Sequence, residues 1–318
     1  MSGKYEMVGL LLDGVYEGHE TGVGHPECPE RYGAVRGKLE AMGLVGEMGK
    51  VEVREATREE IVRCHHEDYF DLAKAEIEAG NGMLSTGDTN VSPRSYEVAM
   101  RASGGVVNAV DMVMEGELER AFCAVRPPGH HATPDRGMGF CVFNHIAVGA
   151  RHAQAAHGIE RVAIVDWDVH HGNGTQDIFV EDESVFFFST HQSPWYPGTG
   201  AASERGRGKG EGTILNAPFP AGTGMESIGE AFREGFGRAM ETFRPELVMI
   251  SAGFDSRLGD PLGQFRLGDE DFVELTKVVM GVAEAYGEGR VVSMLEGGYD
   301  LEGLGSAVGA HVGALCVG

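Results

Sequence analysis

Cysteine is scarce in this chain of 318 residues and follows no regular spacing. An odd number of cysteines without a Cys-x-x-Cys pair argues against a disulfide framework and against a zinc site built from thiolates. It favours reduced thiols in an intracellular compartment. The five cysteines are Cys28, Cys64, Cys123, Cys141 and Cys316.

Long hydrophobic runs are also missing. The apolar run near the amino terminus, Met7–Leu12, stops at Asp13 and is too short for the core of a signal peptide. No stretch approaches the length of a transmembrane helix. We therefore expect a cytoplasmic protein that makes no use of a membrane.

Positive charge is in short supply, because 26 Lys and Arg residues face 49 Asp and Glu residues, for a formal net charge of -23. Such a surface repels nucleic-acid phosphates and favours cationic partners, so we expect no autonomous nucleic-acid binding. Hydrophobic residues are plentiful at 42%, enough for a large core. No repeat or linker divides the chain, and we expect a single domain over residues 1–318.

The pattern of apolar segments predicts an α/β fold with a central, mainly parallel sheet flanked by helices. Short apolar runs, each followed by a loop rich in Gly, Pro, Asp or His, predict strands at Val8–Leu12, Ala121–Val125, Arg161–Val165, Val185–Ser189, Leu247–Ser251 and Val291–Leu295. Longer amphipathic stretches predict helices at Phe143–His157, Met225–Phe243, Asp269–Tyr286 and Leu301–Leu315. Two further helix starts are indicated by Ser92-Pro93 and by a capping box at Thr57 and Glu60.

One loop concentrates polar chemistry directly after a predicted strand. In an extended chain, Asp166, Asp168 and His170 lie on one face, while Trp167 and Val169 are buried on the other. A carboxylate and an imidazole two residues apart are positioned to hold one cation. A polar turn that caps the next helix is the alternative for this segment.

The loops after four of the predicted strands decide between these interpretations. Ligands of open α/β sheets bind outside the carboxyl ends of the strands. All four polar clusters fall at that edge, which favours a metal site. The clusters are Arg126–His131, Asp166–Asn173, Ala252–Ser256 and Glu296–Asp300.

Two carboxylates and one imidazole from these loops, Asp168, His170 and Asp255, would balance the charge of a divalent ion. They would also leave a position open for water and substrate, as catalytic zinc sites do. Taken alone, Asp255 fits a helix cap after its strand equally well. Its place beside the other clusters favours the role of metal ligand.

A histidine pair in the first cluster has a pKa range suited to general acid and base work, namely His130 and His131. Asp166 and Asn173 are natural orienting partners for the two rings. A carboxylate stabilises a charged imidazolium, whereas an amide only positions the ring. The other pair, His65-His66, lacks a strand-end context, and we expect it to be structural.

Four aromatic residues sit beside glycines or prolines, where loops display rings. The hydroxyl of Tyr299, after two glycines, is placed to donate to a developing oxyanion. Phe140, Trp195 and Tyr196 are candidates for the walls of a narrow apolar channel. For each of the four, the alternative role is packing in the hydrophobic core.

The same segments resemble the signature blocks of the zinc-dependent histone deacetylases. The resemblance covers nearly the whole chain, and Asn173 with Trp167 resembles the class II branch, which includes bacterial amidohydrolases and acetylpolyamine amidohydrolases. The blocks are Gly24–Arg31, Arg126–Ala132, Asp166–Gln176, Ser251–Asp255 and Leu295–Tyr299.

The resemblance implies an arginase/deacetylase fold with a catalytic Zn²⁺ bound by Asp168, His170 and Asp255. It implies that Tyr299 polarises the amide carbonyl. His131 is implied to act as general base and then acid, with His130 as its electrostatic companion. The carbonyl of Gly139 would face the substrate between the tunnel walls Phe140 and Tyr196, and Asp88 matches a carboxylate at the rim. A structural K⁺ is implied near Asp166, Asp168, His170 and Ser189.

Two positions narrow the expected substrate. Tyr299 stands where weakly active class II members have His, so the resemblance implies catalytic competence. Leu262 stands where polyamine-selective members have a glutamate at the tunnel mouth, and a leucine cannot attract a distant ammonium group. The segment Pro26–Cys28 resembles a constriction motif of the polyamine enzymes, yet it also lies within the first family block, so both interpretations stay open.

The sequence therefore predicts a zinc-dependent amidohydrolase that removes acetyl or other short acyl groups from lysine side chains of proteins or peptides. An acetylpolyamine deacetylase is the alternative within the enzymes. A catalytically silent module that binds acyl-lysine or metal is the alternative from another class. An arginase-like ureohydrolase would need additional Asp/His pairs for two manganese ions, which we do not find.

Overall fold

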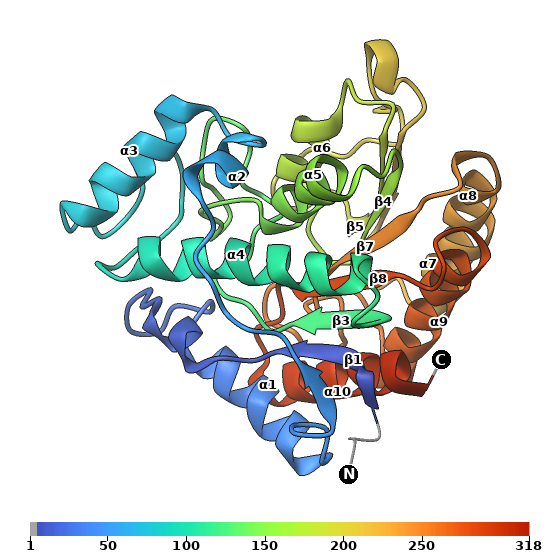
Figure 1. Ribbon diagram of the computed structural model, residues 1–318, viewed down its shortest axis with the longest axis horizontal. Coiled ribbons are helices and arrows are strands. Elements are labelled where there is room, and N and C mark those ends of the chain that lie inside the picture. Colours follow the sequence, from blue (N-terminus) through green and yellow to red (C-terminus); the bar gives the residue numbers. More distant parts are fainter. Residues whose placement is uncertain (1–4, 318) are drawn as a thin grey trace.

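Eight parallel strands form one sheet at the centre of the computed structural model, which describes residues 5–317 (Figure 1). The strand order is β2-β1-β3-β8-β7-β4-β5-β6, and every neighbouring pair is parallel. The predicted parallel sheet is confirmed. The strands are β1 (Tyr5–Leu11), β2 (Met48–Lys50), β3 (Arg120–Cys123), β4 (Val162–Asp166), β5 (Val185–Gln192), β6 (Ile214–Phe219), β7 (Leu247–Ala252) and β8 (Val291–Leu295).

All six predicted strands are present, with ends that differ by a few residues. The two strands that the sequence analysis missed, β2 and β6, are the edges of the sheet. Each pairs on one side only. β2 has only three residues, and the apolar run of β6 is interrupted by Asn216 and Pro218. Pro218 lies within β6, where an edge strand tolerates the missing N–H.

Helices cover both faces of the sheet (Figure 1). The helices α4 and α5 lie on one face, and α1, α9, α10 and the α7–α8 segment lie on the other. The α-helices are α1 (Glu30–Ala41), α2 (Arg58–Val62), α3 (Glu67–Glu78), α4 (Ser95–Met114), α5 (His145–His157), α6 (Asn173–Phe179), α7 (Met225–Glu230), α8 (Arg238–Phe243), α9 (Asp269–Tyr286) and α10 (Leu301–Val317). Short helical turns occur at η1 (Gly14–Gly18) and η2 (Gly208–Gly210), and a π-helical stretch, η3 (Ala231–Gly237), joins α7 to α8.

Side chains of each central strand alternate between the two layers of the core. Val162 and Ile164 pack toward α4 and α5, whereas Ala163 and Val165 pack toward α9 and α10. The alternation continues past the end of β4, because Trp167 is buried in the second layer with Val169. The expectation that these two side chains are buried opposite the polar ones is thereby confirmed.

The predicted helices are present, but two begin later than expected. The capping box at Thr57 is confirmed, with the Thr57 side chain accepting from the backbone N–H of Glu60. The prediction that Ser92-Pro93 opens a helix is wrong by two residues, because Ser92 donates its backbone N–H to Oγ of Ser95, the first residue of α4, and forms a turn before it.

Asn144 sets the start of α5, two residues after the predicted start at Phe143. The Oδ1 atom of Asn144 accepts from the backbone N–H of Ala147 at 3.1 Å, so the first helical residue is His145. All five cysteines are free thiols. Within residues 5–317, none of the helices combines the length and the apolar character that a membrane span requires.

Candidate active site

The four polar loops follow four adjacent strands, β3, β8, β7 and β4, at the centre of the sheet. Because these strands are parallel, their carboxyl ends meet at one edge. The loops therefore bring residues far apart in sequence into a single group. Nearly all of the charged side chains in this group are fully buried, which is costly unless they are paired or hold an ion.

Asp168, His170 and Asp255 form a buried group of possible metal ligands at the base of the site. Nδ1 of His170 lies 3.0 Å from Oδ1 of Asp168 and 3.1 Å from Oδ2 of Asp255. Backbone N–H groups fix the remaining oxygens, with Val169 donating to Asp255 and Gly297 donating to Asp168, both at 2.8 Å. The donor atoms all lie within 4.8 Å of one another.

The charges of this group fit a bound cation. Burial raises the pKa of Asp255 to about 7, because two carboxylates lie side by side in the protein interior. Burial alone lowers the pKa of an imidazole, but hydrogen bonds with Asp168 and Asp255 raise that of His170 to about 10. The two carboxylates thus require a positive charge between them, which a divalent ion supplies as readily as a proton does.

The histidine pair adjoins this group, and each ring has its own partner. Nδ1 of His130 lies 2.8 Å from Oδ2 of Asp166, and Nδ1 of His131 lies 2.8 Å from Oδ1 of Asn173. The ring centroids of His130 and His131 are 4.0 Å apart, and those of His131 and His170 are 5.9 Å apart. The structure therefore brings both predicted orienting partners to the rings for which they were predicted.

The different partners give the two histidines opposite pKa shifts. Burial alone would lower the pKa of His130, yet the nearby charges of Asp166, Asp168 and Glu296 raise it well above the usual value. Burial and the charges of His130 and His170 lower the pKa of His131 well below the usual value. His131 is thus neutral beside a charged His130. Its Nδ1–H donates to Asn173, which leaves the lone pair on Nε2 free to accept a proton.

Tyr299 lies on the loop after β8 and is held from behind by a buried ion-pair network. The guanidinium of Arg31 lies 4.9 Å from the centroid of the Tyr299 ring and donates to the carbonyl oxygens of Gly298 and Glu296. Glu27 in turn binds Arg31 at 3.0 Å and Arg126 at 2.6 Å, with all three side chains fully buried.

The network also involves the Pro26–Cys28 segment. Glu27 faces Arg31 and Arg126 and is not among the residues that line the cavity. The neighbouring His25 packs against the cavity wall at Phe140, with ring centroids 4.7 Å apart, so both interpretations of the segment stay open.

Two other carboxylates, which were not predicted from the sequence, hold the site together. Glu296 accepts from the backbone N–H groups of Gly129 and His130, at 2.6 and 3.1 Å, and so joins the β8 loop to the histidine loop. Asp260 accepts from the backbone N–H of Tyr299 at 2.7 Å. Glu296 carries a signal in the sequence, a carboxylate at the end of an apolar strand, whereas Asp260 has no distinctive context.

The predicted tunnel residues line one cavity of about 230 Å³ above the metal-ligand group. Its lining residues are Asp88, His131, Gly139, Phe140, His170, Trp195, Tyr196, Leu262 and Tyr299. Phe140 has a φ of +69°, a left-handed conformation that is rare for a bulky residue and that presents its ring to Tyr299 at a centroid distance of 6.0 Å. Gly139 has a φ of +57°, and a side chain there would collide with the ring of His131.

The mouth of the cavity is partly polar. Asp88 accepts from the backbone N–H of Gly139 at 2.7 Å and from the hydroxyl of Tyr196 at 3.3 Å. The indole N–H of Trp195 donates to the carbonyl of Leu262 at 2.8 Å, and both aromatic side chains are more than a third exposed. An exposed carboxylate thus stands beside an otherwise apolar entrance.

The residues predicted to surround K⁺ also lie together. Ser189 of β5 is paired with Asp166 at the end of β4, next to Asp168 and His170. All four side chains are buried.

The histidine pair that we expect to be structural, His65-His66, is not among the residues that line the cavity. His65 is buried, and its ring nitrogens bond the carbonyl of Thr133 and the N–H of Asn144.

An Asp/His group lies beneath a narrow cavity at the edge of a parallel α/β sheet, and a neutral histidine and a tyrosine face that cavity. This combination defines a hydrolase of amide bonds. Comparison with known proteins specifies the family. The histone deacetylase domain model matches residues 25–315, and the chain belongs to the histone deacetylase family. A solved structure, the HD domain of HDA15, superimposes with a TM-score of 0.93 at 34% identity, covering 98% of this chain and 90% of that one. The fold is therefore the arginase/deacetylase fold that the resemblance implied.

Relatives come from bacteria, plants and animals. The histone deacetylase-like amidohydrolase of Pseudomonas aeruginosa is 39% identical, over 87% of this chain and 73% of the relative. The chloroplastic histone deacetylase 14 of Arabidopsis thaliana is 40% identical, over 92% and 73%. The polyamine deacetylase HDAC10 of Homo sapiens is 38% identical, over 89% of this chain and 44% of that protein.

Proposed function

We propose that this deacetylase removes acetyl or other short acyl groups from lysine side chains and uses Zn²⁺ held by Asp168, His170 and Asp255. The observation that carries the proposal is the position of this ligand group, at the base of an aromatic cavity that also exposes His131 and Tyr299. When bound, a zinc ion in this group supplies Lewis-acid polarisation of a carbonyl and acidifies a neighbouring water.

The residues of the chain carry the proton transfers. Nε2 of His131 takes the proton of the attacking water and later gives a proton to the leaving amine. The charged ring of His130, held by Asp166, stabilises the negative charge that develops nearby, whereas Asn173 keeps the His131 ring in position. The Tyr299 hydroxyl donates a hydrogen bond to the carbonyl oxygen as it becomes an oxyanion.

The cavity selects and orients the acyl-lysine. Phe140 and Tyr196 lie on its walls and Gly139 between them, so an alkyl chain is enclosed while the backbone of a peptide stays outside. Asp88 at the rim is placed to accept hydrogen bonds from that backbone. Leu262 offers no charge at the mouth, which favours a neutral acyl-lysine over an acetylpolyamine with its distant ammonium group.

We also propose the structural K⁺ beside Asp166, Asp168, His170 and Ser189 that the family resemblance implies. A cytoplasmic location is proposed too, with the five free cysteines as its support. The acidic surface argues against nucleic-acid partners and for cationic substrates, which supports the acetylpolyamine alternative as well as basic peptides.

An assay of acetyl-lysine peptides beside acetylspermidine and acetylputrescine tests the substrate. We expect the zinc-loaded protein to hydrolyse the peptide with the larger kcat/KM. Hydrolysis of the polyamines with the peptide left intact would overturn the lysine assignment and favour the polyamine alternative. Zinc binding without turnover of any substrate would favour the silent module.

Two variants at residue 262 test whether the missing charge at the cavity mouth determines the preference for acyl-lysine over acetylpolyamine. Leu262→Glu places a carboxylate at the mouth, and Leu262→Gln gives the same size without the charge. We expect only the glutamate variant to gain activity toward acetylspermidine, because an ammonium group is attracted by a charge rather than by an amide. Equal gains in both variants would remove charge at residue 262 from the explanation.

A further inference from the structure

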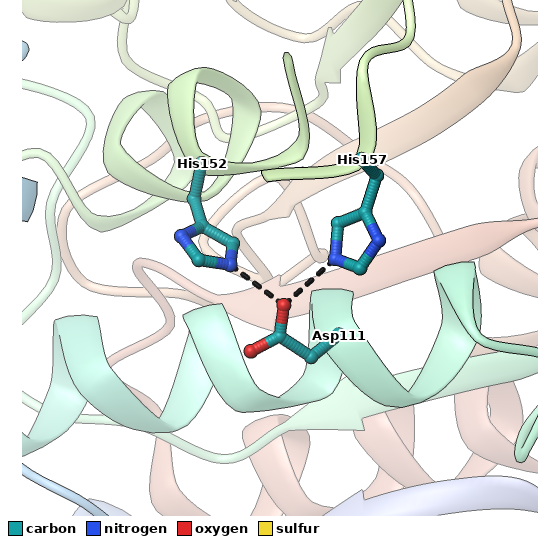
Figure 2. Close-up of side chains that lie close together, drawn as sticks. All are labelled: Asp111, His152 and His157. Atoms are coloured by element: carbon teal, nitrogen blue, oxygen red, sulfur yellow. Dashed lines mark hydrogen bonds and ion pairs between the residues drawn. The ribbon is translucent and has the colours of Figure 1, made fainter. Parts of the chain in front are cut away.

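A second cluster of metal-binding side chains joins α4 to α5, outside the catalytic cavity. Asp111 projects from α4, and His152 and His157 come from α5 (Figure 2). Oδ1 of Asp111 lies 2.6 Å from Nε2 of His152 and 2.8 Å from Nε2 of His157. The three side chains offer donor atoms that lie within 4.8 Å of one another, as those of the catalytic group do.

The arrangement resembles a coordination shell, with the two rings reaching one oxygen from different directions. Figure 2 shows both imidazoles side by side above the Asp111 carboxylate, with their tips converging on one of its oxygens. Five positions along a helix make about 1.4 turns, so the two rings leave α5 at different angles and converge at their tips. A cation bound by both Nε2 atoms and Oδ1 requires these side chains to move apart by a few tenths of an ångström, because donors that bind one Zn²⁺ at about 2.0–2.1 Å lie further apart than the present 2.6 and 2.8 Å.

Hydrogen bonding among the three residues leaves one buried atom unexplained. Nδ1 of His152 is buried and has no hydrogen-bond partner, although it lies 3.6 Å from Oε1 of Glu60. If Nε2 donates to Asp111, Nδ1 faces this carboxylate either as the lone pair of a neutral ring or as the second N–H of an imidazolium, at 3.6 Å in both cases. If Nε2 instead binds a cation, the proton resides on Nδ1 and points at Glu60. Histidines that bind metals commonly direct the other ring N–H at a carboxylate in this way.

The neighbouring residues fix this outer carboxylate. Glu60 is bound by Arg54 at 2.6 Å and is the last residue of the capping box that starts α2. Its position is therefore set independently of His152. The site is also accessible, since the side chains of Asp111 and His157 are 30% and 15% exposed.

We propose that Asp111, His152 and His157 form a second site for a divalent cation of the zinc class, which ties α4 to α5. Imidazole nitrogens with a single carboxylate suit Zn²⁺, Ni²⁺ or Cu²⁺ rather than Mg²⁺ or Ca²⁺. The three protein ligands, one of which is the partly exposed carboxylate of Asp111, leave the remaining coordination positions to water.

The site stabilises the structure and takes no part in the reaction. Its two imidazoles come from the middle and the end of α5, whereas the first turn adjoins the histidine loop, where Nδ2 of Asn144 donates to the carbonyl of Ala132. His152 and His157 lie about 10 and about 18 Å along α5 from its first residue, His145. We therefore expect the cation to raise the melting temperature while kcat/KM stays unchanged.

Zinc stoichiometry after equilibrium dialysis tests the inference. We expect two zinc ions per wild-type chain. We expect one zinc ion per chain in the variants His157→Gln and Asp111→Asn, of which the second keeps the shape of the side chain. The control His66→Gln changes an exposed histidine outside both clusters and retains two. Zinc added beyond the first equivalent should raise the melting temperature of the wild type and of His66→Gln, but not that of His157→Gln.

The catalytic variant Asp255→Asn separates the two sites. It should keep one zinc, and the double variant with His157→Gln should keep none. A wild-type chain with a single zinc that Asp255→Asn abolishes would overturn the second site, as would two zinc ions in His157→Gln. A single zinc lost in His157→Gln but kept in Asp255→Asn would support this site and refute the proposed catalytic one.

Discussion

At the scale of single residues, the two histidines of the active site differ through the atoms that their Nδ1 groups face. Asp166 faces His130 with a carboxylate, and Asn173 faces His131 with an amide, each at 2.8 Å. In the proposed mechanism His131 is the general base, which must be neutral at the working pH, and an amide partner does not favour its charged form. The carboxylate instead favours a charged ring at His130.

Exchanging the amide for a carboxylate should move the pH profile. In Asn173→Asp a negative charge faces Nδ1 of His131 and raises the pKa of that ring, by about 1–3 units for an opposite charge at this distance. Because the base works only in its neutral form, activity is lost as the pH falls through its pKa. The acidic limb of kcat/KM against pH should therefore shift to higher pH.

The matched control is Asn173→Gln, which keeps the amide and adds no charge. Its acidic limb should stay where it is in the wild type, whatever the loss of rate. If Asn173→Asp leaves the acidic limb unmoved, His131 is not the base.

Tyr299 should be required for turnover but not for metal binding. Tyr299→Phe removes one donor to the developing oxyanion, a change that typically lowers kcat by about 10²–10³-fold. Zinc content should be unchanged, because the tyrosine is not one of the three ligands. Tyr196→Phe serves as control, since that hydroxyl bonds Asp88 at the mouth, and we expect less than about a tenfold loss. Equal losses in the two variants would contradict this assignment.

At the scale of elements, close packing of α4 explains the adjacent glycines in its centre. A Cβ atom at Gly104 would lie 2.5 Å from the backbone nitrogen of Ala56 and would also collide with the carbonyl of Arg54. This contact brings α4 against the segment before α2, which positions Glu60 next to His152. Helix propensity alone would favour alanine at this position.

Gly104→Ala should therefore destabilise the protein, by about 1–3 kcal/mol, because backbone atoms cannot yield as side chains do. Gly281→Ala is the matched control in α9, where nothing lies within 4 Å of the added methyl group. That variant should gain about 0.5–1 kcal/mol from the lower entropy of its unfolded chain. Urea unfolding measures both, and a gain in stability for Gly104→Ala would refute the close approach.

At the scale of the whole molecule, a net charge of -23 surrounds an entrance that carries its own carboxylate, Asp88. Such a field attracts positively charged substrates and repels negative ones, and salt screens it. The field acts on a peptide before the acetyl-lysine reaches the cavity. Residues flanking the acetyl-lysine should thus influence association even where they make no direct contact.

Acetyl-lysine peptides flanked by arginine or by glutamate should differ in their response to salt. Between about 0.01 and 1 M ionic strength the screening length falls from about 30 to about 3 Å. We expect kcat/KM for the arginine peptide to fall by about tenfold over this range, while that for the glutamate peptide rises or stays level. Parallel responses of the two peptides would show that the field plays no part.

The sequence alone determined the six inner strands of the parallel sheet and the main groups of the site. Apolar runs that end in Asp, His and Gly clusters specify strands, and parallel strands necessarily bring their carboxyl ends to one edge. That rule was sufficient to group Asp168 and His170 with Asp255, although their loops are more than eighty residues apart. It also places the histidine pair and Tyr299 at the same edge.

Only the tertiary structure decided which side chains support that site from a distance. Arg31 lies 267 positions before the Gly298 carbonyl that it binds, and nothing in the local pattern of α1 marks it as a partner of Tyr299. From the sequence, Asp111 is likewise only one polar position of α4. The packing of α4 on α5 brings it to His152 and His157. Side-chain periodicity reports which face of an element is buried, whereas the identity of the residue it meets depends on how distant elements pack.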